Sequence, residues 1–523
     1  MEWWRRSVIY QIYPRSFQDS DGNGVGDLEG VRRRLDYLKG LGVGAIWISP
    51  IYPSPMADFG YDVSNYCGVD PLFGTLASFD ALLKEAHARG LKVILDFVPN
   101  HTSDQHPWFL ESRKSKDNPK RDWYLWRDGH EGAPPNNWIA NFGGSAWEFD
   151  PATGQYYLHS FLKEQPDLNW RHPEVRQAMM DSVRFWLDRG VDGFRVDVIW
   201  LLIKDEEFRD NPPNPAWTPD KPEIERLLQV YSADRPEIHD VIEDLRATID
   251  AFQDRVLIGE IYLPIERLVA YYGRDLKGAH LPFNFHLIST AWRPDAIAKL
   301  IAEYEASLPQ GAWPNWVLGN HDQKRIATRI GPQQARVAAM LLLTLRGTPT
   351  LYYGDEIGME NGDIPSERAQ DPWEKREPGL GLGRDPQRTP MCWDASPNAG
   401  FTQGTPWLPL NADYKTRNVA AQLAERRTLL QLYKRLISLR TTEAPLASGT
   451  FKIVSVKEAL LVYDRIAKGR TVRVGLNFSN GPIPVPFPTA ATVLASTELD
   501  RAGQTYAGAL ELRPNEGVVL QLS

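Results

Sequence analysis

Cysteine is almost absent from this sequence. Only Cys67 and Cys392 occur among 523 residues, and two cysteines cannot build a disulfide framework. They also lack the close spacing of metal-binding cysteine motifs. We therefore expect both side chains to be buried and to pack as small hydrophobic groups.

Long hydrophobic runs and an excess of positive charge are also missing. No window approaches the length of a membrane span, and the first residues, MEWWRRSVIYQIYP, lack the apolar core and small-residue cleavage site of a secretory signal. The formal net charge of -8 argues against nucleic acid or an anionic membrane as a partner, because both favour a basic surface. We expect a cytoplasmic protein, monomeric or homodimeric, with no nucleic-acid or membrane partner.

Short apolar, β-branched segments recur along the chain, with helical patterns between them. We expect strands at residues 8–14, 43–49, 92–98, 192–198, 255–261, 278–284, 315–321 and 348–354. Eight strands that alternate with helices predict an α/β protein with a (β/α)₈ TIM barrel. A basic amphipathic run over about residues 418–439 is the expected closing helix.

The spacing of these strands predicts an inserted domain. The third and fourth expected strands lie much further apart than the roughly 30 residues of one βα unit, so residues 102–172 are expected to form a domain, here called domain B, over the active-site end. Two further polar insertions follow the fourth and eighth strands, at 210–223 and about 361–407. All three should lie at the C-terminal end of the barrel, where barrel enzymes build their active sites.

The last part of the chain has a different pattern. After about residue 444, alternating Val, Thr and Tyr are broken by Gly and Pro, as in ALLVYDRIAKGRTVRVGLNF, which predicts an antiparallel β-domain. The expected division is therefore 1–101 for the first part of the barrel, 102–172 for domain B, 173–444 for the rest of the barrel and 445–523 for a C-terminal β-sandwich.

Acidic residues occur at the ends of four expected strands. They are Asp96, Asp197, Glu260 and Asp322. One acid at a strand end is usually a helix cap or a solvated turn residue. Four acids that converge on one rim of a barrel are harder to explain as caps. Arg195 alternates with Asp197 in DGFRVDV, so both charges should point into a pocket rather than into bulk solvent.

Such a group of carboxyl groups suits glycoside hydrolysis. One carboxylate attacks the anomeric carbon or activates water, and a second carboxyl group protonates the departing oxygen. A third carboxylate can raise the pKa of the acid and bind sugar hydroxyls. Arg195 would keep Asp197 charged and oriented.

At these residues the sequence resembles glycoside hydrolase family 13, the α-amylase family. DFVPNH (96–101), GFRVDV (193–198), GEIY (259–262) and NHD (320–322) look like the four signature regions of that family, in order. QPDLN (165–169) resembles a fifth region in its oligo-1,6-glucosidase and α-glucosidase branch. The likeness covers most of residues 1–440.

The resemblance implies roles for individual residues. Asp197 would be the nucleophile, Glu260 the general acid/base and Asp322 the stabiliser of the transition state. Three further residues, His101, Arg195 and His321, would line the subsite for the non-reducing glucose.

Four more residues are expected at this subsite, two of them implied by the resemblance. Asp62, in GYDV, would grip the outer hydroxyls of the glucose together with Arg388, although the same loop also offers Arg384. Tyr61 and Phe161 are expected to stack on sugar, with buried packing as the alternative for each. A clamp of this kind would close the pocket beyond the terminal sugar and make the cleavage exo-acting.

The segment DSDGNGVGD (19–27) spaces oxygen donors at alternate positions, like the first part of an EF-hand loop. The bidentate Glu of that loop is missing, because its twelfth position is Gly30. A turn without an ion is therefore the alternative. In the resembling branch this loop holds a structural Ca²⁺, so the expected ligands are Asp19, Asp21, Asn23, the Val25 carbonyl and Asp27. No catalytic cofactor is expected.

The resulting functional hypothesis is a retaining, exo-acting α-glucosidase that acts on short α-glucosides, a small-molecule oligosaccharide substrate. The linkage can be α-1,4, α-1,6 or both, since Val198 after the nucleophile accompanies α-1,6 acceptance in the resembling branch. Transglucosylation is also expected. The alternatives are an oligo-1,6-glucosidase, or a glucosyl transferase of the sucrose isomerase or trehalose synthase type. A non-catalytic relative is a further alternative, but the catalytic acids are present.

Overall fold

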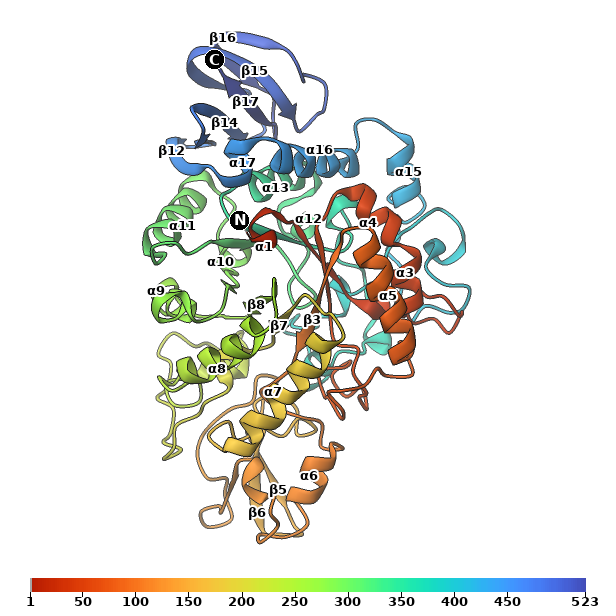
Figure 1. The fold of residues 1–523 in the computed structure, drawn as a ribbon, viewed down its shortest axis with the longest axis vertical. Coiled ribbons are helices and arrows are strands. Elements are labelled where there is room, and N and C mark those ends of the chain that lie inside the picture. Colours follow the sequence, from red (N-terminus) through yellow and green to blue (C-terminus); the bar gives the residue numbers. More distant parts are fainter. Residues whose placement is uncertain (1) are drawn as a thin grey trace.

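The computed structural model describes residues 2–523. Its centre is a parallel sheet of eight strands (Figure 1). The strands are β1 Ile9–Ile12, β2 Ala45–Ile48, β3 Lys92–Phe97, β7 Gly193–Val196, β8 Val256–Gly259, β9 Leu281–Pro282, β10 Asn315–Val317 and β11 Thr348–Tyr352. Each lies inside one of the eight segments expected from the sequence, so the prediction of a (β/α)₈ barrel is confirmed.

Neighbouring strands pair in the order β10-β11-β1-β2-β3-β7-β8-β9. The barrel is closed between β9 and β10 by a side chain. Asn315 Oδ1 accepts a hydrogen bond from the Asn284 N–H at 2.9 Å, and Asn315 Nδ2 donates to the Pro282 carbonyl. One amide side chain thus supplies a donor and an acceptor where strand pairing is missing.

Both faces of the barrel strands are buried. Along β2, Ala45 and Trp47 belong to the core inside the barrel, whereas Ile46 and Ile48 pack outward against the helices. This alternation between two buried faces explains why the strands read as nearly continuous apolar runs. At the C-terminal end, inward positions carry polar side chains instead, and these build the site described below.

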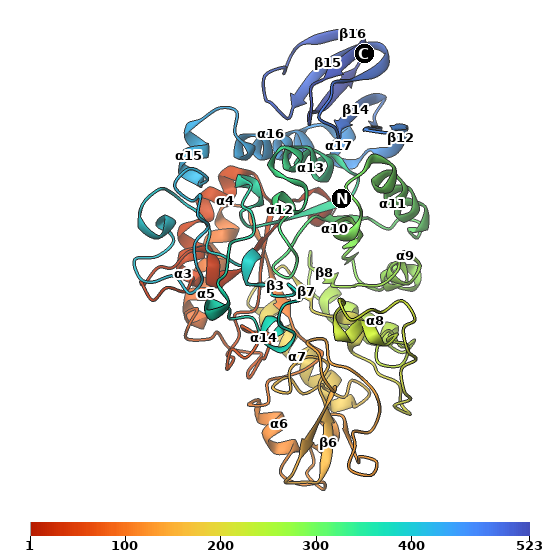
Figure 2. The ribbon, with the colours of Figure 1, turned by 180° about the vertical axis from the view of Figure 1, so that it is seen from behind.

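Helices surround the sheet (Figures 1 and 2). The longer ones are α5 Leu76–Ala88, α7 Pro173–Asp188, α8 Ile238–Asp250, α11 Pro294–Ser307, α13 Pro332–Thr344 and α16 Leu429–Thr442. The shorter ones are α1 Trp3–Arg6, α2 Pro14–Phe17, α3 Leu28–Arg33, α4 Leu35–Leu41, α9 Ile265–Leu268, α10 His286–Ser289, α12 Ile326–Ile330, α14 Pro372–Arg376, α15 Val419–Ala424 and α17 Ala444–Ser448.

The expected closing helix is two helices, α15 and α16. The chain is extended at Glu425, and the Thr428 side chain accepts a hydrogen bond from the Gln431 N–H to begin the second helix. The capping threonine therefore restarts the helix where the apolar pattern alone predicted continuity.

Domain B lies between β3 and β7, at the lower end of Figure 1. It contains α6 Pro107–Ser112 and a three-stranded antiparallel sheet of β4 Trp126–Arg127, β6 Gln155–Leu158 and β5 Trp147–Asp150, in that order. A small core of its own includes Trp138 and Trp147. An insertion after the third barrel strand is thus confirmed.

The C-terminal domain packs on α13, α16 and α17, at the opposite end of the molecule from domain B. Its strands are β12 Thr450–Lys457, β13 Leu460–Ala467, β14 Arg470–Asn477, β15 Ile483–Ser496, β16 Thr505–Leu512 and β17 Gly517–Leu522. All six belong to one antiparallel sheet. The sheet bends within β15, where the register shifts between Pro486 and Ala490, and Val485 lies over Gly475. The expected sandwich is thus a single sheet folded onto itself.

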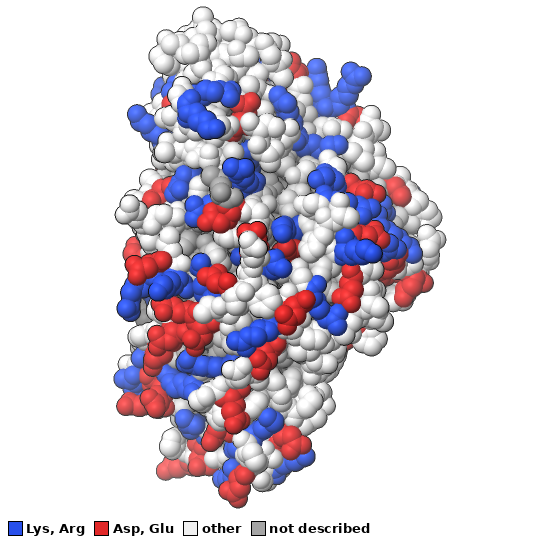
Figure 3. All heavy atoms as spheres, in the orientation of Figure 1, with Lys and Arg blue, Asp and Glu red and all other residues white. Residues whose placement is uncertain are grey.

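Two surface properties bear on the sequence predictions. Within residues 2–523, no helix is both long and apolar enough to cross a membrane. On the face shown in Figure 3, positive and negative side chains are interspersed.

Candidate active site

The four strand-end acids meet at one end of the barrel. Asp96 lies in β3, Asp197 follows β7, Glu260 follows β8, and Asp322 follows β10. All except Asp96 line a pocket of about 430 Å³. The rest of its wall comes from domain B and from the two later insertions, through residues such as Phe142, Asn214 and Trp373. The three insertions therefore overhang the active-site end, as the strand spacing predicted.

Arg195 lies at the centre of the acids and is completely buried. Its Nη1 donates hydrogen bonds to Asp96 Oδ1 at 2.7 Å and to Asp197 Oδ1 at 2.8 Å. Its Nη2 lies 2.7 Å from Glu260 Oε2. One guanidinium group thus holds three carboxylates, which explains why alternating charges can occupy a strand buried on both faces.

Burial sets the protonation of this cluster. It raises the pKa of Asp96 to about 6, although Arg195 acts in the opposite direction. Burial also raises the pKa of Asp197 and Glu260, again against the effect of Arg195. Because three carboxyl groups share one cation, the cluster as a whole retains a proton more readily than isolated carboxylates would.

Val198 has a backbone conformation that is uncommon for a β-branched residue. Its φ angle is 38°, in the left-handed region. The Val198 N–H donates a hydrogen bond to Glu260 Oε2 at 2.9 Å. The turn after Asp197 therefore places a backbone donor on Glu260, and the strained conformation is tied to the orientation of that carboxyl group.

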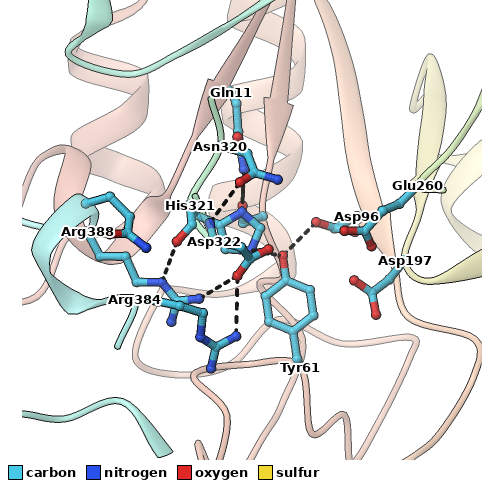
Figure 4. Close-up of polar contacts among 12 residues, drawn as sticks. Gln11, Tyr61, Asp96, Asp197, Glu260, Asn320, His321, Asp322, Arg384 and Arg388 are labelled. Carbon is cyan, nitrogen blue, oxygen red and sulfur yellow. Dashed lines mark hydrogen bonds and ion pairs between the residues drawn. The ribbon is translucent and has the colours of Figure 1, made fainter. Parts of the chain in front are cut away.

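Asp322 lies across the site from Asp96, Asp197 and Glu260, and two arginines contact it (Figure 4). Arg388 Nη2 lies 2.9 Å from its Oδ1 and Arg384 Nη1 lies 3.3 Å from the same oxygen. Burial alone would raise the pKa of Asp322, but the permanently charged Arg384 and Arg388 hold it well below its ordinary value. Asp322 is therefore ionised in the free protein.

Tyr61 links the two halves of the site (Figure 4). Its hydroxyl lies 3.0 Å from Asp96 Oδ2 and 2.7 Å from His321 Nε2, and its ring stacks on the His321 ring. The Gln11 amide lies 2.8 Å from His321 Nδ1. If Gln11 donates to Nδ1, Nε2 carries the imidazole proton and donates to Tyr61, which donates to Asp96.

Both site histidines are neutral. Burial lowers the pKa of His101 to about 4 and lowers the pKa of His321 further below its ordinary value. His101 Nε2 lies 3.0 Å from the Tyr61 carbonyl and 3.1 Å from Gln165 Nε2. A neutral imidazole can bind sugar hydroxyls at this position without adding charge to the pocket.

The structure does not place Asp62 in the pocket. Both oxygens of its buried carboxylate accept backbone hydrogen bonds, from the Ala57 N–H at 2.8 Å and from the Asp58 N–H at 3.0 Å. Asp58, four residues earlier, lines the pocket instead. Asp62 shapes the loop that presents Asp58, and the expected sugar contact moves to Asp58.

A similar change applies to the arginine. Arg384 lines the pocket and pairs with Asp58 Oδ1 at 2.7 Å and Asp371 Oδ1 at 2.6 Å. Arg388 is buried behind it, where its Nε donates to the His321 carbonyl at 2.9 Å. The pocket-facing clamp is thus Asp58 with Arg384, and Arg388 orients Asp322.

The other expected sugar contacts lie where the sequence placed them. Tyr61, His101, Phe161 and His321 all line the pocket. The Phe161 ring packs against His101 at 5.2 Å and against Phe142 at 5.6 Å. Phe161 therefore packs on its neighbours and also faces the pocket, and its stacking on sugar stays a prediction.

The loop after α2 gathers three carboxylates. Oxygens of Asp19, Asp21 and Asp27 lie within 4.8 Å of one another. Asp19 also accepts hydrogen bonds from the backbone N–H groups of Asp21, Gly22 and Gly24, while Asp27 accepts one from Gly30 and so caps α3.

This arrangement fits a hard divalent cation. Three carboxylates at this spacing repel one another without a cation, and oxygen donors are what Ca²⁺ prefers. The loop is also packed closely, since a Cβ atom at Gly24 would lie 1.9 Å from the Thr405 carbonyl oxygen.

Comparison with known proteins identifies the family. A family model described as the alpha amylase catalytic domain matches residues 11–449. The chain belongs to the α-amylase family. A probable alpha-glucosidase of Rhizobium meliloti (strain 1021) is 42% identical over 481 residues, which cover 89% of this chain and 87% of the relative. An oligo-1,6-glucosidase of Parageobacillus thermoglucosidasius is 38% identical over 564 residues, which cover 99% of each.

Solved structures of the α-amylase family agree with this assignment. An alpha-glucosyl transfer enzyme, XgtA, superposes with a TM-score of 0.94 at 40% identity and covers all of both chains. The trehalulose synthase MutB from Pseudomonas mesoacidophila MX-45 gives a TM-score of 0.93 at 36% identity, again over all of both chains. The family resemblance read from the sequence motifs is thus confirmed over the whole chain.

Proposed function

We propose that this α-amylase-family protein is a retaining, exo-acting α-glucosidase. It would release glucose from the non-reducing ends of short α-glucosides. The observation that carries the proposal is the shared contact of Asp197 and Glu260 with the guanidinium of Arg195, at the bottom of a pocket flanked by Asp58 and Arg384. Names of relatives support the same activity.

In this proposal, Asp197 attacks the anomeric carbon while Glu260 donates a proton to the departing oxygen. The bond to that oxygen breaks as the bond to Asp197 forms. Water then attacks the glucosyl ester, with Glu260 now accepting a proton, so glucose is released with the α configuration. Two carboxyl groups bound to one guanidinium lie close together, and closely spaced carboxyl groups are the arrangement that retention requires.

Asp322 would act as an anion on the opposite side of the sugar. The two arginines keep it ionised, so it can bind sugar hydroxyls and stabilise positive charge that develops at the anomeric carbon. Arg195 would restrain Asp197 and Glu260 during the same step.

Exo action would follow from the Asp58–Arg384 pair. These two side chains line the pocket beside Asp322 and offer hydrogen-bonding groups to the outer hydroxyls of a terminal glucose. A chain that continued past that glucose would meet this ion pair. We therefore propose cleavage one glucose at a time.

The linkage proposal includes α-1,4 and α-1,6 bonds, because relatives carry the names alpha-glucosidase and oligo-1,6-glucosidase. Transglucosylation is part of the proposal, and glucosyl transfer to a sugar is the second candidate for the main activity. Two structural neighbours, an alpha-glucosyl transfer enzyme and a trehalulose synthase, favour this candidate.

We also propose a structural Ca²⁺ held by Asp19, Asp21, Asn23, the Val25 carbonyl and Asp27. When bound, the ion would neutralise the three carboxylates and fix the loop, with no part in the reaction. A cytoplasmic location is proposed as well, because neither cysteine forms a disulfide.

Time-resolved NMR on maltose and isomaltose tests the main proposal. We expect the α anomer of glucose to appear first with the wild-type protein, and Asp197→Asn to lose activity on both sugars. The surface variant Asp181→Asn is the matched control and should behave as wild type. First-formed β-glucose, or normal turnover by Asp197→Asn, would refute the mechanism.

A further inference from the structure

Three insertions that are distant in the sequence are tied together at the rim of the pocket. The tie consists of Gly143 and Gly144 in domain B, Glu223 in the insertion after β7, and Arg376 and Glu377 in the insertion after β11. We call these five residues the rim clasp. None of them is one of the catalytic or glucose-binding groups described above.

The rim clasp is a closed cycle of hydrogen bonds. The Gly144 N–H donates to Glu223 Oε2 at 2.8 Å, and the Glu223 N–H donates to Glu377 Oε1 at 2.8 Å. Arg376 returns to domain B, donating from Nε to the Phe142 carbonyl at 3.1 Å and from Nη2 to the Gly143 carbonyl at 2.9 Å. Each insertion is therefore bonded to both of the others.

The two glycines make this close approach possible. Both have φ near 80°, which other residues rarely adopt. A Cβ atom at Gly143 would lie 3.0 Å from Glu377 Cγ, and one at Gly144 would lie 3.0 Å from Arg376 Nη2. A side chain at either glycine would therefore have to displace Glu377 or Arg376 of the clasp.

The rim clasp holds residues that line the pocket. Glu377 Oε2 accepts a hydrogen bond from Trp373 Nε1 at 2.9 Å, and the Trp373 ring packs 5.6 Å from Phe142. Glu223 begins the segment that contributes Ile224, Leu227 and Leu228 to the pocket wall. One carboxylate, that of Glu377, therefore positions wall residues from two insertions.

This wall shares the pocket with Glu260. The departing oxygen must lie within hydrogen-bonding distance of Glu260, and Glu260 lines the pocket together with Ile224, Leu227 and Leu228. The group that leaves or accepts glucose would therefore lie against this wall. The groups assigned to glucose are instead anchored to the barrel strands and to the Asp58–Arg384–Asp371 cluster. The five clasp residues make no hydrogen bond or ion pair with these charged groups. Their link to them is the Phe142 ring, which packs 4.8 Å from the Arg384 guanidinium.

We propose that Glu377 and Arg376 are positioning residues for the acceptor side of the pocket, and that the rim clasp sets how the glucosyl intermediate divides between water and a sugar acceptor. The inference rests on the proposed glucosidase function. An intact clasp holds the wall against a bound sugar and favours transfer. A broken clasp lets the wall move and lets water compete.

Glu377→Gln and Arg376→Met test the inference, with Glu367→Gln as a matched control in the same insertion. Each protein is assayed with α-glucosyl fluoride, whose leaving group needs no acceptor wall, and with maltose as both donor and acceptor. We expect fluoride hydrolysis to stay within about twofold of wild type. The KM for maltose should rise about five- to tenfold, the size expected when one or two hydrogen bonds are lost. The share of transfer products should fall by a similar factor.

Two results would overturn the inference. The first is a maltose KM and a transfer share that stay at wild-type values in both clasp variants. The second is a loss of fluoride hydrolysis as large as the loss on maltose, with unfolding temperature unchanged, which would assign the clasp to the glucose site itself. A wild-type protein that cannot hydrolyse α-glucosyl fluoride would instead refute the proposed function, and the inference with it.

Discussion

Asp58 and Asp62 have different roles in the structure, and separate substitutions of the two test that difference. Asp58 pairs with Arg384 at 2.7 Å and lines the pocket, whereas Asp62 accepts two backbone hydrogen bonds behind it. Asp58→Asn should therefore reduce sugar turnover, and Asp62→Asn should reduce stability. Arg384 remains paired with Asp371 in the first variant, so that variant should fold.

The expected sizes follow from the contacts. A hydrogen bond to a charged group contributes about 1.5–3 kcal/mol, so loss of the Asp58 carboxylate should lower kcat/KM for maltose about 10- to 150-fold. In Asp62→Asn an amide NH₂ replaces one acceptor and faces a backbone N–H. Leaving that buried donor unsatisfied should lower the free energy of unfolding by about 1–3 kcal/mol.

The assays are steady-state kinetics on maltose and isomaltose, with denaturant unfolding of both variants. Asp58→Asn should unfold like wild type within about 1 kcal/mol, and Asp62→Asn should keep kcat/KM within about fivefold of wild type, on the order of 1 kcal/mol of activation free energy. The reasoning would be refuted if Asp62→Asn folded with wild-type stability but lost more activity than Asp58→Asn. That outcome would restore the sugar contact predicted from the GYDV motif.

Three further predictions concern stability. The free energy of unfolding of Val198→Gly should be about 1 kcal/mol higher than that of Val198→Ala, measured by denaturant unfolding, because only glycine adopts a positive φ without strain. Equal stability of the two variants would contradict the strain. Burial raises the pKa of Asp355 to about 7, against the effect of Arg325. The folded protein therefore binds a proton that the unfolded chain has lost, and stability should fall as pH rises from about 4 to about 7, by up to about 1.4 kcal/mol per pH unit. Asp355→Asn should flatten that slope in thermal unfolding measured across this range, and an unchanged slope would exclude the group. Chelation should lower the unfolding temperature of the wild type and added Ca²⁺ should restore it, whereas Asp21→Ala should respond to neither; a wild type unaffected by chelation would argue against the ion.

The barrel could be predicted because its signals are local. Each of the eight strands is a short apolar run, and the acids at the ends of four of them can be read directly from the sequence. Arg195 beside Asp197 was informative for the same reason. Two charges in a strand that is buried on both faces must point into a pocket that they share. The contact of Arg195 with Asp96 and Glu260 depends on the closure of the barrel, so only the structure shows it.

The clamp residues could not be assigned from the motifs. Asp58 and Asp62 are four residues apart, as are Arg384 and Arg388, and composition does not distinguish them. Positive φ angles at Met56, Phe59 and Gly60 turn the chain so that Asp58 faces the pocket and Asp62 faces the backbone. These turns bring Asp58 to Arg384 of the insertion after β11, and no local pattern in the sequence reports that contact.

The rim clasp was missed for a related reason. Its bonds join residues up to 234 positions apart, and none of its members belongs to a signature region. The two adjacent glycines in FGGS were the available signal. Two adjacent glycines indicate that the backbone approaches another segment closely. They do not indicate which segment that is.

The single arginine shared by three acids also affects the second half of the proposed reaction. Once Asp197 carries glucose as an ester, it no longer contributes a negative charge. Arg195 then neutralises only Asp96 and Glu260. With one anion fewer beside it, Glu260 has a lower pKa and loses its proton more easily. The same cation that crowds the acids in the resting protein would thereby convert the proton donor into the base that activates water, with no movement of the chain.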